Sequence, residues 1–86
     1  MKAKLFEIDS KLYEAIEDIY DSFTQTELIK INFLIKVLKA CVAIFDIERN
    51  GDEVYAKIKT AKMEMLKTKI AELGYSMDES RRIKIK

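Results

Sequence analysis

The spacing of apolar residues between positions 28 and 47 predicts the central element of the fold. An α-helix rotates by about 100° per residue, so this stretch would present two apolar faces that lie roughly 170° apart. Two nearly opposite faces need cover on both sides, which the neighbouring helices of one small chain supply with difficulty. The first face contains Leu28, Ile31, Ile35, Leu38, Val42 and Phe45, and the second contains Ile29, Phe33, Val37, Ala40, Ile44 and Ile47.

The first face has the spacing of a heptad seam, so we predict that it forms a dimer or core seam. Its flanks include Leu34 and Cys41, which are too apolar for a free-standing two-stranded coiled coil and favour a four- or six-helix bundle. The alternative is a compact monomer with an unusually buried central helix. Asn32 lies on the polar strip that remains, where a change to Asp is expected to be nearly silent.

Turn and capping signals divide the chain into three predicted helices, at about 10–22, 25–49 and 53–73. Thr24 and Glu27 have the spacing of a capping box at the start of the central helix. That helix is expected to end at the sequence "RNG", where Asn50 or Gly51 can take the left-handed cap conformation. Long helices are also expected because the chain contains no Pro and only two Gly residues.

Both ends of the chain alternate polar with apolar residues, which is the period of a β-strand. These segments, "KAKLFEI" (2–8) and "RIKIK" (82–86), are expected either to be disordered or loosely docked, or to form a short two-stranded pairing within one chain or between chains. The sequence "SMDE" (76–79) fits a further capping box, for one or two extra helical turns. The predicted fold is therefore all-α: three helices with short extended or disordered ends, packed as a helical-bundle homodimer.

The overall composition is that of one folded domain. At 86 residues the chain is large enough for a single modest core, so we predict one helical domain over 1–86. Apolar residues make up 49% and charged residues 36%, which excludes a chain that is disordered by composition. The net charge of +1 gives no overall attraction to nucleic acid or membranes. The single Cys41 excludes an intrachain disulfide framework and is expected to be a buried thiol.

A membrane-spanning helix over 28–47 is rejected, although about 20 residues would be enough to cross a bilayer. The charged residues that exclude the span, each costing about 2.5–3.5 kcal/mol near its centre, are Lys30, Lys36, Lys39 and Asp46.

The segment "MKAKLFEIDS" at the start lacks the long apolar core and small-residue cleavage site of a secretory leader. We therefore expect a cytoplasmic protein.

Side chains suited to catalysis or metal binding are scarce. The chain has no His, which removes the usual general base and the usual zinc or di-iron ligands of helical bundles. One Cys cannot form a thiolate cluster, and the two Gly residues make no phosphate-binding loop. We therefore expect no enzymatic activity, no catalytic residues, no metal and no cofactor.

Four carboxylates on the first predicted helix form what we call the acidic ridge: Glu14, Glu17, Asp18 and Asp21. Like charges at positions i and i+4 of a helix cost about 0.2–0.5 kcal/mol per pair, which a cationic partner would relieve. One interpretation is a solvated face that is neutralised by Lys57, Lys59 or Lys67 of the same assembly. The other interpretation is a partner-binding surface that docks a basic protein.

The C-terminal residues 81–86 form a basic tail, whose cations are Arg81, Arg82, Lys84 and Lys86. Cations on a mobile tail could contact phosphates and give salt-sensitive binding that does not depend on base sequence. The simpler interpretation is that the tail only keeps the protein in solution.

The predicted function is that of a non-enzymatic protein-interaction module: a small helical dimer that acts as an adaptor, inhibitor or regulator of another macromolecule. Its partners would be a second copy of itself and an unidentified protein, for which the acidic ridge favours a basic surface. Accessory proteins of mobile elements have this size and simplicity, which is an association only. The alternative is a nucleic-acid-binding regulator that uses the basic third helix and the basic tail.

Overall fold

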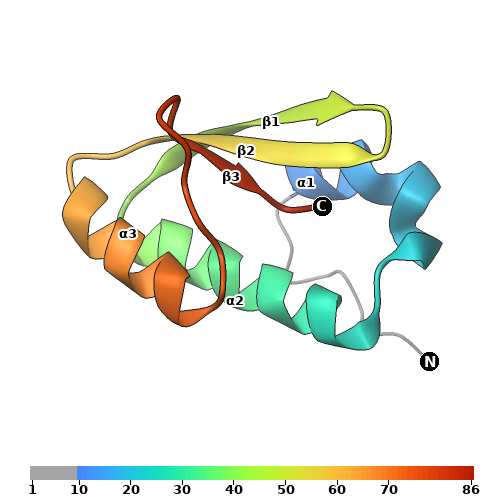
Figure 1. Cartoon of the computed structure of the whole chain (residues 1–86), viewed down its shortest axis with the longest axis horizontal. Helices are drawn as coiled ribbons and strands as arrows, with labels where there is room; N and C mark the ends of the chain where they lie inside the picture. Colours follow the sequence, from blue (N-terminus) through green and yellow to red (C-terminus); the bar gives the residue numbers. More distant parts are fainter. Residues whose placement is uncertain (1–9) are drawn as a thin grey trace.

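The computed structural model of the chain describes residues 10–86, and it shows helices packed on one side of an antiparallel sheet (Figure 1). The predicted all-α helical bundle is therefore wrong, because the fold is α+β. Within residues 10–86 the sheet has three strands in the order β1-β2-β3. The elements in chain order are α1 (Ser10–Ile16), the 3-10 helix η2 (Glu17–Ser22), α2 (Gln25–Ala40), β1 (Ile44–Asn50), β2 (Glu53–Lys59), α3 (Met63–Glu72) and β3 (Arg82–Lys84).

The central helix α2 begins at Gln25, as the sequence predicts. It ends at Ala40, nine residues before the predicted end at position 49. At its start the capping box is confirmed: the Thr24 hydroxyl accepts a hydrogen bond from the Glu27 amide, and the Glu27 carboxylate accepts one from the Thr24 amide, at 2.8 Å. At its end Val42 adopts a positive φ of 50°, which turns the chain out of the helix. The Thr60 hydroxyl donates to the Cys41 carbonyl at 2.7 Å and so satisfies one of the terminal carbonyl groups.

The β1–β2 hairpin replaces the end of one predicted helix and the start of the next. Asn50 pairs with Glu53, and Gly51 takes a φ of +64° in the turn between the strands. The two loop residues are therefore Gly51 and Asp52, and Gly at the first loop position adopts the positive φ of a two-residue hairpin turn without steric cost. The sequence interpretation used the same left-handed conformation at "RNG" for a helix cap instead.

Strand β2 shows why its helical prediction fails. Val54, Ala56 and Ile58 are buried on the face toward the helices, and they alternate with exposed residues such as Lys57. This period of two brings the three apolar side chains onto one face of a strand, whereas a helix would place Ala56 on the side opposite Val54 and Ile58. The third helix therefore begins only at Met63.

The C-terminal residues are not a free tail, because β3 pairs antiparallel with β2. Tyr55 lies opposite Lys84, and the Ile85 amide donates to the Val54 carbonyl at 2.8 Å. The strand period of "RIKIK" is thus realised within one chain. The extra helical turns expected over 76–79 do not form, since Met77 instead makes a β-bridge with Ile83. The other alternating segment, 2–8, lies outside the described residues.

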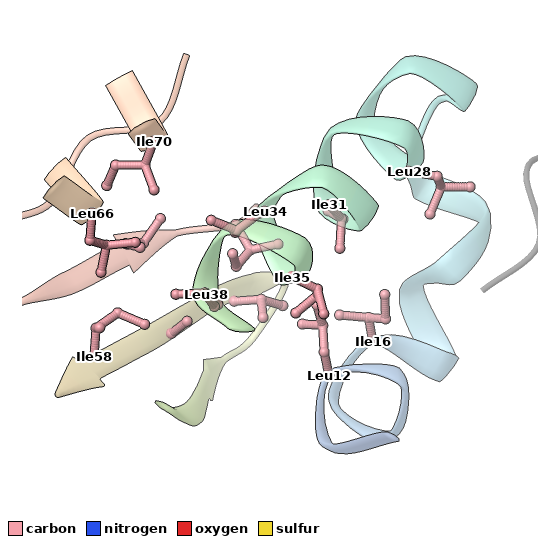
Figure 2. Close-up of a cluster of buried hydrophobic side chains, with 14 of the residues drawn as sticks. Leu12, Ile16, Leu28, Ile31, Leu34, Ile35, Leu38, Ile58, Leu66 and Ile70 are labelled. Atoms are coloured by element: carbon pink, nitrogen blue, oxygen red, sulfur yellow. The ribbon is translucent and has the colours of Figure 1, made fainter. Parts of the chain in front are cut away.

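The core lies between the helices and the inner face of the sheet (Figure 2). Four members of the predicted dimer or core seam are buried there, where the sheet supplies the cover that a second chain was expected to give. The seam does not continue past the helix: Val42 is 75% exposed in the turn, and Phe45 is half-buried on β1. The four buried seam residues are Leu28, Ile31, Ile35 and Leu38.

Candidate functional site

The outward face of α2 remains apolar where the sheet does not reach it. Ile29 is 42% exposed and Phe33 51% exposed, and Ala40 is exposed on the same side of the helix. All three belong to the second apolar face predicted from the sequence. The last two residues of that predicted face lie on β1 and not on α2. Ile44 is exposed there, while Ile47 is half-buried on the inner side of the sheet.

This outward face forms one wall of a groove of about 260 Å³ between α2 and α3. Phe33, Val37 and Ala40 line it from α2, and Met65, which is 42% exposed, lines it from α3. We call this feature the α2–α3 groove. The remaining residues that line it are Cys41, Lys36 and Lys69.

The local sequence explains why the two helices leave this groove open. Helix α3 buries Leu66 and Ile70, which join the core cluster that also contains Leu34 of α2. Met65 and Lys69 lie one position before these two core residues, so they fall on a neighbouring side of α3 and line the groove together. The groove thus lies beside a close-packed contact that fixes the separation of its walls.

The charged side chains that line the groove from the described residues are basic. Among the described residues that line it, the charged ones are Lys36 and Lys69, and none is a carboxylate. The Lys36 ammonium lies 5.5 Å from the centroid of the Phe33 ring, which is a cation–π geometry. The aromatic ring is therefore bordered by positive charge while part of its surface faces water.

The acidic ridge is partly neutralised within the chain. Glu14 lies on α1, and Glu17, Asp18 and Asp21 lie on η2. The Arg49 guanidinium from the end of β1 forms a hydrogen-bonded ion pair with Asp18, and this hydrogen bond lowers the pKa of the Asp18 carboxyl. The same guanidinium donates to the Ala15 carbonyl at 3.2 Å. Within the described residues, the cation that pairs with Asp18 is thus Arg49, which the sequence interpretation did not consider.

The predicted phosphate contacts also have carboxylate neighbours in the structure. Arg82 forms ion pairs with Asp78 at 3.3 Å and with Glu48 at 3.4 Å. Lys84 lies 3.9 Å from the Glu53 carboxylate, and Lys86 lies 3.7 Å from that of Glu27. Binding of a phosphate by these three residues would therefore compete with carboxylates that are already present.

The fourth predicted phosphate contact, Arg81, borders a different hollow. Lys57, Lys59 and Arg81 line it together with Asp46, and its volume is also about 260 Å³. Three cations and one carboxylate give it a positive balance. Of all residues over 10–86, no group of three or more Cys, Asp or Glu side chains is placed to hold a metal ion.

Asn32 differs from its predicted place on a solvated polar strip. Its side-chain oxygen Oδ1 is buried and accepts no hydrogen bond from the described part of the chain. A buried acceptor without a partner is costly, and a negative charge at the same position would cost more. Asn32→Asp is therefore expected to destabilise the fold rather than to be nearly silent.

Sequence reasoning identified one wall of the α2–α3 groove and missed the other. The second apolar face included Phe33, Val37 and Ala40, but the predicted third helix began at 53, and no role on a groove was predicted for Met65. The exposed pair Met65 and Lys69 becomes recognisable only when α3 begins at Met63 and Leu66 is placed in the core.

Comparison with known proteins gives no match: no protein-family model, no curated protein and no solved structure is similar enough to this chain to suggest a relative. Within the described residues, no helix combines the length and the apolar character that crossing a bilayer requires. The site must therefore be interpreted from its own geometry and chemistry.

Proposed function

We propose that this chain is a non-enzymatic protein-interaction module, which acts as an adaptor, inhibitor or regulator by binding another protein in the α2–α3 groove. The observation that carries the proposal is the exposure of Phe33 (51%) and Met65 (42%) on the two walls of one groove. Covering apolar surface is favourable by about 25 cal/mol per Å². A contiguous exposed apolar feature with a polar border is typical of an interaction site.

The residue types in the groove support binding of a protein. Aromatic residues and Met are enriched at protein interfaces, and the flexible Met side chain adapts to different partner shapes. The two helical walls form a trough, which suits the insertion of an amphipathic helix from a partner.

The homodimer predicted from the sequence stays a prediction, but its interface must differ from the proposed seam. The inward face of α2 is buried within the chain, so a second copy would have to use an outward surface. The cytoplasmic location also stays a prediction. The buried thiol of Cys41 is compatible with a reducing compartment.

Nucleic-acid binding is a second candidate, and the hollow lined by Lys57, Lys59 and Arg81 favours it. Binding to phosphates should weaken steeply as salt rises, because each contact releases counterions. A gel-shift series with increasing salt tests this candidate. Nucleic-acid binding through this hollow requires that the affinity falls steeply as salt rises. It also requires that the slope of log affinity against log salt concentration becomes shallower when Arg81 and Lys59 are replaced by Ser.

The protein-binding proposal is tested by affinity capture from the native host followed by mass spectrometry. The bait proteins are the wild-type chain, Phe33→Ser in the groove, and Tyr13→Ser as the matched control. Tyr13 is 45% exposed on α1 and does not line the groove. We expect the same protein to be captured by the wild type and by Tyr13→Ser, and to be lost with Phe33→Ser. Equal capture by all three folded baits would contradict the proposal.

A further inference from the structure

The α2–α3 groove also indicates the chemistry of its partner. We propose that it binds an acidic amphipathic helix, with apolar side chains on one face and carboxylates along both edges of that face. This inference rests on the proposed function and adds to it the class of partner segment. The shape of the groove and the sign of the charges that line it support this class of partner.

The shape of the groove suits a short helical segment. From Phe33 to Ala40 the α2 wall extends over eight residues, and the seven rises between them correspond to about 10 Å along the helix axis. A partner helix covers this distance with two turns, so apolar residues at positions i, i+4 and i+7 would face the groove. Met65 provides the apolar contact from the opposite wall.

The sign of the charges suits a carboxylate-rich partner. One cation stands on each wall, Lys36 on α2 and Lys69 on α3, and no carboxylate from the described residues lines the groove. Partner carboxylates that flank the apolar positions would lie near these two ammonium groups. Lysine side chains can extend their aliphatic stems along the apolar surface while their charges reach such carboxylates at the rim.

The same charges disfavour two copies that pair through this face. In a two-fold dimer each surface patch meets an identical patch, so lysines would approach lysines. Like charges across an interface suppress association. A membrane surface is disfavoured by shape, because interfacial helices present a protruding apolar face, whereas this one is recessed between two helices.

The inference is tested with two synthetic helical peptides and the full-length chain. Both peptides carry Leu at positions i, i+4 and i+7; one has Glu at the flanking positions and the other has Lys. Fluorescence anisotropy should give about tenfold tighter binding of the Glu peptide at low salt. The difference should shrink at 1 M salt, where the screening length falls to about 3 Å.

Three variants connect the binding to the groove. Phe33→Ser should weaken binding of both peptides, because it removes the shared apolar contact. The double variant Lys36→Glu and Lys69→Glu should reverse the preference, so that the Lys peptide binds more tightly. Tyr13→Ser should leave both affinities unchanged. Circular dichroism of each variant shows whether it is folded, which these exposed positions are expected to allow.

The possible failures separate this inference from the proposed function. Equal affinity for the two peptides overturns the acidic partner and leaves a protein-binding groove in place. A second possible result is that neither peptide binds, that the wild type has the mass of two chains, and that Phe33→Ser has the mass of one chain, 10.0 kDa. This result shows that a second copy occupies the groove, and it also overturns the acidic partner. A monomer that binds neither peptide but binds anionic lipid vesicles through Phe33 overturns both proposals.

Discussion

The two faces of α2 have similar residues but different surroundings. The inward face is buried by the sheet and by α1, whereas the outward face leaves Ile29 and Phe33 largely exposed. Both faces consist of aliphatic or aromatic residues at helical spacing, so the sequence of the helix alone does not distinguish them. Among the described residues, what distinguishes them is the cover that the β1–β2 hairpin and β3 supply on the inward side (Figure 1). The inward residues are Leu28, Ile31, Leu34, Ile35 and Leu38.

This difference assigns separate roles to the two faces. Burial of a Leu or Ile side chain stabilises the folded state by about 1.5–3 kcal/mol relative to leaving it exposed. The inward face therefore contributes to stability, while the outward face contributes little until a partner covers it. Substitutions on the two sides of one helix should separate the free energy of unfolding from the affinity for a partner.

The largest effect is expected from Ile35→Asp on the inward face. Ile35 is 1% exposed, so the new carboxylate would be buried without a partner. We expect a loss of more than about 3 kcal/mol in the free energy of unfolding, measured by urea denaturation. Phe33→Asp on the outward face is the matched control and should lose much less. Similar losses for the two variants would refute the proposed division between the faces.

An intermediate effect is expected from Asn32→Asp. The Oδ1 atom of Asn32 is buried and has no hydrogen-bond partner among the described residues. A charge there should lower the free energy of unfolding by about 1–3 kcal/mol at neutral pH. The loss should diminish in acid, where the new carboxyl becomes protonated. A variant as stable as the wild type at pH 7 would show that this position is solvated.

A small effect on stability is expected from Phe33→Ser, although its effect on binding should be large. Surface substitutions usually change the free energy of unfolding by no more than about 0.5 kcal/mol. Urea denaturation of Phe33→Ser should therefore give nearly the wild-type midpoint while partner capture is lost. A substantial loss of stability would mean that Phe33 belongs to the core rather than to a binding surface.

The smallest effect concerns pH and the capping box that starts α2. The hydrogen bond from the Thr24 amide lowers the pKa of the Glu27 carboxyl below its ordinary value of about 4.5. A carboxyl whose pKa is lowered by folding contributes stability that is fully present above its ordinary pKa and is lost as the pH falls through the lowered value. Urea midpoints should therefore decrease between pH 5 and pH 3. Glu27→Gln should show a shallower decrease, and an unchanged pH dependence would exclude this role.

The sequence predicts the first half of the fold better than the second. The capping box of Thr24 and Glu27 and the inward face of α2 depend on local spacing, and both are found in the structure. The region 44–59 fits two periods at once: Phe45 continues the helical spacing from Val42, yet it also alternates with Asp46 as in a strand. Choosing the helical period there removed the hairpin from the prediction.

That single error affected the C-terminus and the site as well. The alternation of 82–86 was recognised, but its partner β2 had been assigned to a helix, so no place in a sheet was available. The groove needs α3 to pack through Leu66 and Ile70, which depends on contacts between residues distant in sequence. Local patterns therefore identified Phe33 as apolar and unpartnered, while the opposite wall at Met65 required the three-dimensional structure.

The most direct test of the binding groove is site-specific photo-crosslinking in the native host. A photoreactive phenylalanine analogue placed at Phe33 retains the aromatic ring, and the same analogue at Tyr13 provides a control of similar exposure. We predict that the analogue at position 33 forms a covalent adduct with one partner protein, and that the analogue at position 13 does not. Adducts of equal yield at both positions, or none at position 33, would contradict the assignment of the α2–α3 groove as a protein-binding site.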